Sequence, residues 1–307
     1  MRTALAFAII FLFQNAHLTS QTAPDLPNPP AITGVNGWVP LMVVAPKYFG
    51  PNALPVAESM FASVDTLSDF ELRAVKQDAT GDRTRNLYAR FNFVILPKVI
   101  SVEFSAMAIE HYEMSVARRI YVNAWHGKGK GTTTGDIGVT TAIQVVRNKK
   151  FPDVALRLNF RTVGGEMLED ARYCDAPGYF FDATFGKDFK LNFSFLEKIR
   201  PYVSGGFYCW QTYKFKHIQD DAPMGNAGIN LYAKKIRLNA ETAGYYGYEN
   251  TGDRPLLFRT NLNYDTKKVT YRIGFEEGLH DYDFTTFYIG AAYHFDISTY
   301  MKSLASN

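Results

Sequence analysis

The sequence has few cysteines, little net charge and no long apolar run in its body. The 307-residue chain contains only Cys174 and Cys209, too few for a disulfide framework. Its 33 basic and 30 acidic residues leave a net charge of +3, and no basic block accompanies a nucleic-acid-binding motif, so no nucleic-acid partner is expected. Beyond the first residues there is no run of about 18 apolar residues, so we expect no transmembrane helix in the mature chain.

Catalytic motifs are also lacking. The sequence contains no H-E-x-x-H, P-loop or G-x-S-x-G motif. His294 lies on the polar side of its segment and has no serine two residues away, as a lipid-hydrolysing Ser–His pair would need. His126, His217 and His280 fall in expected loops, where solvated histidines are commoner than metal ligands. We therefore expect no enzymatic activity, no cofactor and no metal.

The N-terminus predicts export. Arg2 precedes an unbroken apolar run over residues 4–13, and residues 1–20 resemble a secretory signal cleaved after Ser20. Cleavage after Ala16 and an uncleaved anchor are the less favoured alternatives, since the run is short for a bilayer. In an oxidising compartment the two cysteines either pair or remain free thiols, and the sequence leaves both open.

Residues 21–68 differ in composition from the rest of the chain. They are rich in proline and glycine, which break regular elements, yet they contain Trp38, Tyr48 and Phe49. A disordered linker has no need of such aromatic residues. Two interpretations remain equally open: a flexible periplasmic leader, and an ordered extension that packs under or inside the following domain.

From residue 69 onward, apolar and polar residues alternate with a period of two, as in strands with one apolar face. The 19 tyrosines and 24 phenylalanines fit this class, because aromatic residues favour strands and membrane interfaces. About twelve such strands are expected, an even number as in single-chain membrane barrels. They cover residues 70–77, 87–95, 100–106, 136–145, 154–161, 179–186, 203–210, 226–234, 236–242, 256–263, 269–276 and 284–295.

The connections between these strands alternate in length. Long or polar gaps are expected at residues 78–84, 115–135, 164–178, 215–225, 249–254 and 277–283, and tight turns between most of the other strands. Short periplasmic turns and long outer loops are typical of membrane barrels. One connection, 188–198, is long where a tight turn is expected. Both ends of the barrel domain, assigned to residues 69–296, should then lie on the periplasmic side, with 297–307 as a short tail.

The polar faces of the strands carry most of the charges. A barrel of about twelve strands is too wide for apolar side chains to fill its interior, so we expect the charges to face inward and the apolar face to contact lipid. The predicted lumen-lining charged residues are Arg73, Arg90, Glu103, Asp136, Arg157, Arg161, Asp182, Arg237, Glu241, Arg259, Arg272 and Glu276.

The last strand carries a family resemblance. Residues 290–295 are G-A-A-Y-H-F, with Tyr288 before them. A glycine followed by aromatics at alternate positions resembles the last-strand assembly signal of Gram-negative outer-membrane β-barrels, which assigns Gly290, Tyr293 and Phe295 to that signal. The stretch G-D-I-G-V from Gly135 is similar to a strand opening of transporter-like barrels. The resemblance implies recognition by the outer-membrane barrel assembly machinery.

The sequence thus predicts an all-β, transmembrane, antiparallel up-and-down barrel in the outer membrane of a Gram-negative bacterium. The leading hypothesis for its function is a narrow channel or transporter for small polar solutes, selective through the width and charges of its lumen. The alternative is a closed barrel whose loops or N-terminal segment bind a partner. Expected partners are outer-membrane lipid and lipopolysaccharide, and a small polar solute as cargo. The glycine-rich 124–135 loop is expected to be solvated and flexible, and contact of its lysines with lipopolysaccharide or an anionic solute is the less favoured alternative.

Overall fold

Twelve long antiparallel strands form the body of the protein. The computed structural model describes residues 42–147, 150–191, 193, 195–212, 214 and 217–296. The expected signal peptide (1–20), residues 21–41 of the N-terminal extension and the tail (297–307) lie outside the described residues. No helix in these ranges is long and apolar enough to cross a bilayer.

The strands follow one another around the sheet in chain order. They are β1 (Ser68–Ala79), β2 (Asp82–Leu96), β3 (Ile100–Met114), β5 (Ile137–Val146), β6 (Asp153–Arg161), β7 (Gly178–Gly186), β9 (Lys198–Gln211), β10 (Gln219–Ala233), β11 (Ile236–Tyr245), β12 (Leu256–Asp265), β13 (Val269–His280) and β14 (Thr285–Phe295). Two short strands lie outside this series: β4 (Lys130–Thr133) pairs with β3, and β8 (Phe189–Lys190) pairs with β9.

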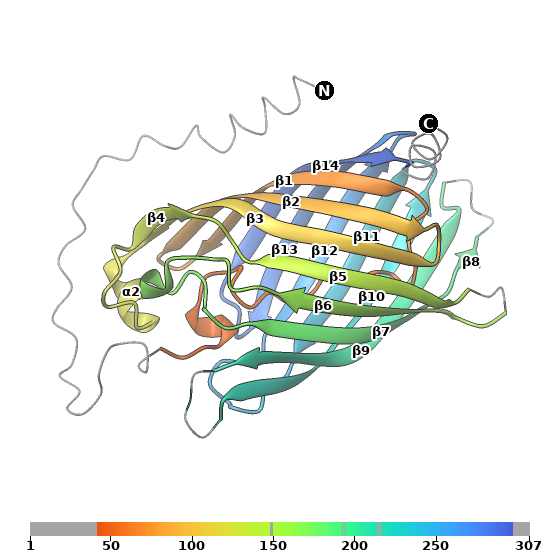
Figure 1. The fold of residues 1–307 in the computed structure, drawn as a ribbon. Helices are drawn as coiled ribbons and strands as arrows, with labels where there is room; N and C mark the ends of the chain where they lie inside the picture. The colour runs from red at the N-terminus through yellow and green to blue at the C-terminus, as the bar shows by residue number, and fades with distance from the viewer. Residues whose placement is uncertain are drawn as a thin grey trace, which may run out of the picture.

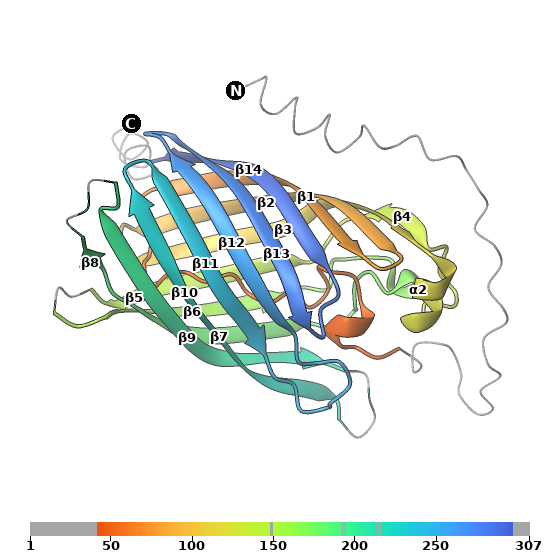
Figure 2. The same ribbon diagram turned by 180° about the vertical axis from the view of Figure 1, so that it is seen from behind.

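The sheet closes on itself. β1 pairs antiparallel with β14 from Ser68 opposite Phe295 to Asp78 opposite Thr285, and β9 pairs with β10, which completes the ring. Figures 1 and 2 show the closed, tilted barrel from opposite sides. A closed sheet leaves no unpaired edge in hydrocarbon, and the predicted twelve-stranded antiparallel barrel is confirmed.

The strand faces are oriented as membrane insertion requires. Leu158 is 40%, Phe258 36% and Ile273 60% exposed on the outer surface, whereas Arg259 is only 2% exposed. Alternate side chains of a strand point to opposite faces, so the arginines on the other face of β6, β12 and β13 point into the lumen. The apolar face therefore contacts the surroundings, and the charged face fills the interior.

The two ends of the barrel differ. Ser68 and Phe295, which bound the barrel strands, lie together at one end, called here the turn end. The other end, called the loop end, carries the long connections with a one-and-a-half-turn helix, α2 (Val116–Tyr121), β4 and a 3-10 turn, η3 (Leu168–Asp170). The predicted placement of both barrel termini at the same end agrees with this arrangement. β8 occupies the long 188–198 connection at the turn end.

Two of the expected long gaps are shorter than predicted. β1 and β2 are joined at Thr80 and Gly81, whose φ of +75° suits glycine, and the polar residues around them belong to the strands. β10 begins at Gln219, although Pro223 resembles a loop residue. The carbonyl of Pro223 accepts a bond from the Tyr246 N–H, just beyond the β10–β11 pairing. Its missing N–H points to the same side, so proline costs no strand hydrogen bond there.

A cluster of apolar side chains packs inside the loop end of the barrel. It combines residues that precede β1 with the inner faces of the strand ends and loops. The largest members are Trp210, Tyr112, Tyr208, Tyr245, Tyr282, Phe49 and Phe284. The barrel therefore contains a small apolar core at one end of an otherwise polar lumen. Cys174 and Cys209 are both buried and unpaired, which resolves the open cysteine question in favour of free thiols.

Candidate functional site

The segment before β1 runs through the inside of the barrel. This lumen segment, residues 42–67, begins at the loop end, where the short 3-10 turn η2 (Pro46–Tyr48) lies against the loops. Lys47 Nζ contacts Asp281 Oδ1 at 3.2 Å, and the hydrogen bond to Asp281 raises the pKa of Lys47. At the turn end the Lys98 N–H donates to the Asp65 carbonyl at 2.9 Å. Of the two interpretations of the N-terminal extension, the described part has the ordered, lumen-docked form.

Arginines of the barrel wall bind the main chain of this segment. Arg161 donates to the Ala53 carbonyl at 2.5 Å, Arg259 to Val56 at 3.2 Å and Arg157 to Glu58 at 2.5 Å. Arg200 donates to the carbonyls of Phe61 and Ala62 at 2.8 and 3.1 Å. We call these four side chains (Arg157, Arg161, Arg200 and Arg259) the carbonyl-binding arginines.

Each carbonyl-binding arginine also pairs with an acidic residue of the wall. The partners at 2.5–2.8 Å are Asp182 for Arg157, Asp136 for Arg161, Asp153 for Arg200 and Glu241 for Arg259. A guanidinium has five N–H donors, so an arginine neutralised by one carboxylate keeps donors for a carbonyl. The wall thus presents charge-balanced hydrogen-bond donors to the chain that crosses the lumen.

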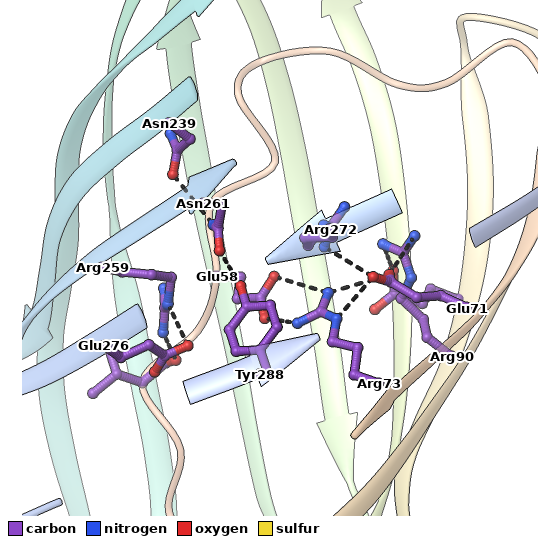
Figure 3. A network of polar contacts seen from close by, with 12 residues as sticks. Glu58, Glu71, Arg73, Arg90, Asn239, Arg259, Asn261, Arg272, Glu276 and Tyr288 are labelled. Carbon is purple, nitrogen blue, oxygen red and sulfur yellow. Dashed lines mark hydrogen bonds and ion pairs between the residues drawn. The ribbon is translucent and has the colours of Figure 1, made fainter. Parts of the chain in front are cut away.

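The Glu58 side chain of the lumen segment joins a network of ion pairs in the wall. Glu58 Oε1 lies 2.5 Å from Arg73 Nη1, and Arg73 Nε lies 2.8 Å from Glu71 Oε1 (Figure 3). Arg272 and Arg90 contact the same Glu71 carboxylate at 3.2 and 3.1 Å. The three arginines therefore share the fully buried Glu71. Arg90 also pairs with Asp69 of the wall at 2.6 Å, whereas the second carboxylate partner of Arg73 is the half-exposed Glu58 of the lumen segment.

Aromatic rings hold the central arginine in place. The Arg73 guanidinium lies 4.8 Å from the Tyr88 ring centroid and 5.0 Å from that of Tyr288. Cations are attracted to ring faces at such distances. The Tyr288 hydroxyl donates in turn to Asn261, so the ring has a fixed position (Figure 3). The position of Arg73, and with it the site for Glu58, is set by the wall strands.

A buried arginine joins the β6–β7 loop to strands β2 and β3 at the loop end. Arg172, fully buried in the β6–β7 loop, contacts Asp82 Oδ2 at 2.7 Å and Glu110 Oε1 at 2.8 Å. Asn52 of the lumen segment donates to Glu110 Oε2 at 2.7 Å, and the Gly50 N–H donates to the Ala171 carbonyl at 2.8 Å. A side chain at Gly50 would meet Arg172 atoms at 2.9 Å, so glycine permits the close approach. The loop and the lumen segment thus form one packed unit.

A polar cavity of about 390 Å³ remains beside the lumen segment. One side is formed by residues 51–65 and the opposite side by inward residues that include Tyr88, Glu103 and Asn159. At roughly 30 Å³ per molecule, the volume has room for on the order of ten waters. The arrangement provides hydrogen bonds and charges for a small polar molecule, and no group of three metal-ligating side chains occurs among the described residues.

The structure places ten of the twelve predicted charged residues on this cavity. Asp182 and Glu241 lie behind it, bonded to Arg157 and Arg259. Gly290 of the predicted assembly signal faces Arg73 and Arg272 in register, while Tyr293 is exposed on the outer face.

Sequence reasoning missed the lumen contacts of Glu58 and Arg200. Glu58 lies in a segment without periodicity, and Arg200 precedes the expected start of its strand. The charged loop around Arg172 was expected to fold inward from its length alone, without its partners Asp82 and Glu110. The only available signal was the start of the 203–210 alternation, which extends back to Arg200 once β9 is taken to begin at Lys198.

Comparison with known proteins shows similarity of fold and no similarity of sequence. No family model and no curated protein matches the sequence. Among solved structures, an outer-membrane channel from Pseudomonas putida F1 aligns with a TM-score of 0.57 at 10% identity, over 78% of this chain and 100% of that chain. The KdgM porin, in complex with disordered oligogalacturonate, aligns with a TM-score of 0.44 at 10% identity, over 74% and 99% of the two chains. The β domain of the Bordetella autotransporter BrkA gives 0.43 at 11%, over 75% and 100%.

Of these three similarities, only the first has a TM-score above 0.5, and at 10% identity it shows the fold alone. The closed ring of twelve strands and the apolar outer face described above are the features of such a barrel. The predicted resemblance to outer-membrane barrels is thereby confirmed at the level of architecture. The chain has the fold of the transmembrane β-barrels of the outer membrane.

Proposed function

We propose that the protein is a channel for small polar solutes in the outer membrane of a Gram-negative bacterium, narrowed from within by its own lumen segment. The observation that carries the proposal is the polar cavity between residues 51–65 and the wall. An apolar exterior around a lumen with charged walls supports an aqueous path across a membrane. The lumen segment limits the path to small solutes.

The charges that line the cavity are nearly balanced. Seven arginines and six carboxylates are among its lining residues, and most of them pair with one another. Rings of fixed charge of one sign select ions of the opposite sign. Paired charges of both signs leave a path with only a weak preference between cations and anions. We therefore propose a path that discriminates by size and hydrogen bonding more than by the sign of the charge.

The surroundings of the barrel follow from its faces. The apolar outer face would contact membrane lipid, and the loop end, which carries the lysines of the 124–135 loop, would face lipopolysaccharide. Gly290, Tyr293 and Phe295 remain the proposed signal for the barrel assembly machinery. Tyr293 is 39% exposed on the outer face, where an assembly factor has access to it.

Planar-bilayer recording of the purified full-length protein tests the channel. We expect discrete, small conductance steps with little difference between cation and anion permeability, because the lumen is narrowed and its charges are balanced. Heat-modifiable migration on a gel serves as the control that the barrel is folded. Folded protein that inserts and gives no conductance, alone or with the lumen segment displaced, would contradict the channel and support a closed barrel.

A further inference from the structure

We infer that the lumen holds a binding site for a small zwitterion near the turn end, where Arg237 binds the carboxylate and Asp65 the ammonium group of the solute. The inference deepens the proposed channel by naming its solute class, and it rests on that proposal for transport but not for binding. The observation behind it is a pair of opposite charges that line one cavity, neither of which forms a close ion pair within the described part of the chain.

Asp65 is the anionic side of the site. It is exposed and lines the cavity, and no basic side chain among the described residues forms an ion pair with it. Its carboxylate accepts a hydrogen bond from Asn92 Nδ2 at 3.3 Å. The nearby Asp69 differs, because it is buried and pairs with Arg90 at 2.6 Å. Asp65 therefore keeps acceptor capacity for a cationic group that enters the lumen.

Arg237 is the cationic side of the site. Its Nη2 lies 3.6 Å from Asp265 Oδ1, which is too far for a hydrogen bond. Asp265 Oδ1 already accepts a hydrogen bond from Thr270 Oγ1 at 2.8 Å. The Arg237 Nε is buried and has no hydrogen-bond partner within the described ranges. Its guanidinium therefore retains donors for a carboxylate, the anion whose geometry it matches best.

A second arginine lies in the same row of the wall. Asn263 pairs in register with Arg237 on β11 and with Arg272 on β13, so the three side chains share the inner face. Arg272 Nε donates to Asn263 Oδ1 at 2.8 Å. Its acidic contact is Glu71, at 3.2 Å, which it shares with two other arginines. The row thus presents two incompletely neutralised guanidinium groups to the cavity.

The two charged sides of the site do not neutralise each other. Arg237 acts on Asp65 electrostatically, yet their side chains form no ion pair. The main chain around Asp65 is held in place, because the Lys98 N–H donates to the Asp65 carbonyl at 2.9 Å and the Val64 N–H donates to Gln144 Oε1 at 3.0 Å. A solute with both charges contacts both sides at once, whereas a simple anion or cation is repelled by one of them.

The position and the size of the cavity restrict the solute further. Asp65 lies three residues before β1 and Arg237 is the second residue of β11, so both are near the turn end and accessible from that compartment. The cavity of about 390 Å³ accepts a molecule of a few heavy atoms together with water. Amino acids with small side chains meet these conditions, and their entry adds no net charge to the lumen.

Ligand-detected NMR on the purified, folded full-length protein in detergent micelles tests the site. The probes are glycine and its two halves, acetate and methylammonium. The variants are Asp65→Asn and Arg237→Gln, each of which removes one charge and keeps the side-chain length similar. Glu197→Gln and Lys267→Gln are the matched controls, because these exposed turn-end residues carry the same charges and do not line the cavity.

We expect the unmodified protein and both controls to bind glycine about tenfold more tightly than either half, because each charged side adds a charge-assisted hydrogen bond. Arg237→Gln should bind glycine no better than methylammonium, and Asp65→Asn no better than acetate. A structural role of these residues would not produce this opposite change in preference. Glycine binding no tighter than that of the two halves, or unchanged in both variants, would overturn the site even if the channel conducts. Binding without conductance would instead contradict the channel alone.

Discussion

Replacing Glu58 by arginine is expected to open the lumen and give the largest change in conductance of any single substitution. Glu58 accepts two contacts from Arg73, at 2.5 and 3.3 Å, and Arg259 and Arg272 also act on its carboxylate electrostatically. An arginine there would face three cations. At 4 Å and an effective dielectric constant of about 20, one such repulsion costs about 4 kcal/mol, which shifts an equilibrium roughly a thousandfold toward the displaced segment.

The measurement is single-channel conductance of full-length Glu58→Arg in planar bilayers, compared with the unmodified protein. We expect severalfold larger or longer openings, on the order of fivefold in mean current, because most of the polar lumen becomes accessible. Glu58→Gln is the matched control: it keeps the size, and Arg73 retains its two contacts with Glu71 at 2.8 and 3.2 Å. Equal conductance of folded Glu58→Arg and unmodified protein would contradict a lumen narrowed by this segment.

Arg172→Ala is expected to cause the largest loss of stability. The substitution removes four hydrogen bonds that Arg172 donates to Asp82, Thr84 and Glu110, and leaves two buried carboxylates with too few partners. Breaking a buried ion pair by removing one partner typically costs about 3–5 kcal/mol. The expected readout is a matching decrease in the free energy of unfolding, measured with urea in detergent micelles and followed by tryptophan fluorescence.

Arg254→Ala provides the control for this loss. Arg254 is also an arginine at the loop end, but it is half-buried, donates to the Gly247 carbonyl at 3.2 Å and lies over the Tyr246 ring. Its removal leaves no buried carboxylate unpaired, so a cost of about 1 kcal/mol or less is expected. An equal decrease in the free energy of unfolding for both variants would contradict a stabilising role of the ion pairs of Arg172 at the loop end.

The barrel was predictable because the alternation of apolar and polar side chains repeats every two residues and can be recognised within each strand. Alternation over β6, with Leu158 outward and Arg157 inward, follows from the two-residue repeat of any strand. The assignment of the charged face to the interior needed only the width of a twelve-stranded barrel and a membrane outside. Both arguments hold strand by strand, so errors in one connection do not spread to the rest.

The predicted lengths of two connections were wrong because polar residues expected in loops belong to strands and point into the barrel. Asp82 and Thr84 resemble loop residues, but they belong to β2 and are buried because both accept hydrogen bonds from Arg172. The strand that contains Pro223 looked interrupted, yet its proline lies just beyond the β10–β11 pairing. In each case a tertiary partner far away in the sequence decides the local structure, and a single sequence does not show that partner.

The lumen segment marks the limit of pattern-based inference. Its contacts are made mainly by its backbone, through carbonyls such as those of Ala53 and Val56, so its side chains carry little trace of them. The aromatic residues Tyr48 and Phe49 indicated order but not location. Only the three-dimensional course of the chain brings Glu58 to Arg73.

The position of the lumen segment is the central claim, and photo-cross-linking tests it most directly. A benzophenone amino acid in place of Ala57, which lines the cavity, would be incorporated into the full-length protein and irradiated in membranes. We expect cross-links, mapped by mass spectrometry, to inward residues of the β1–β6 wall such as Tyr88, Glu103 and Asn159. Cross-links to lipid, to the outer face or to other proteins, with none inside the barrel, would contradict the account.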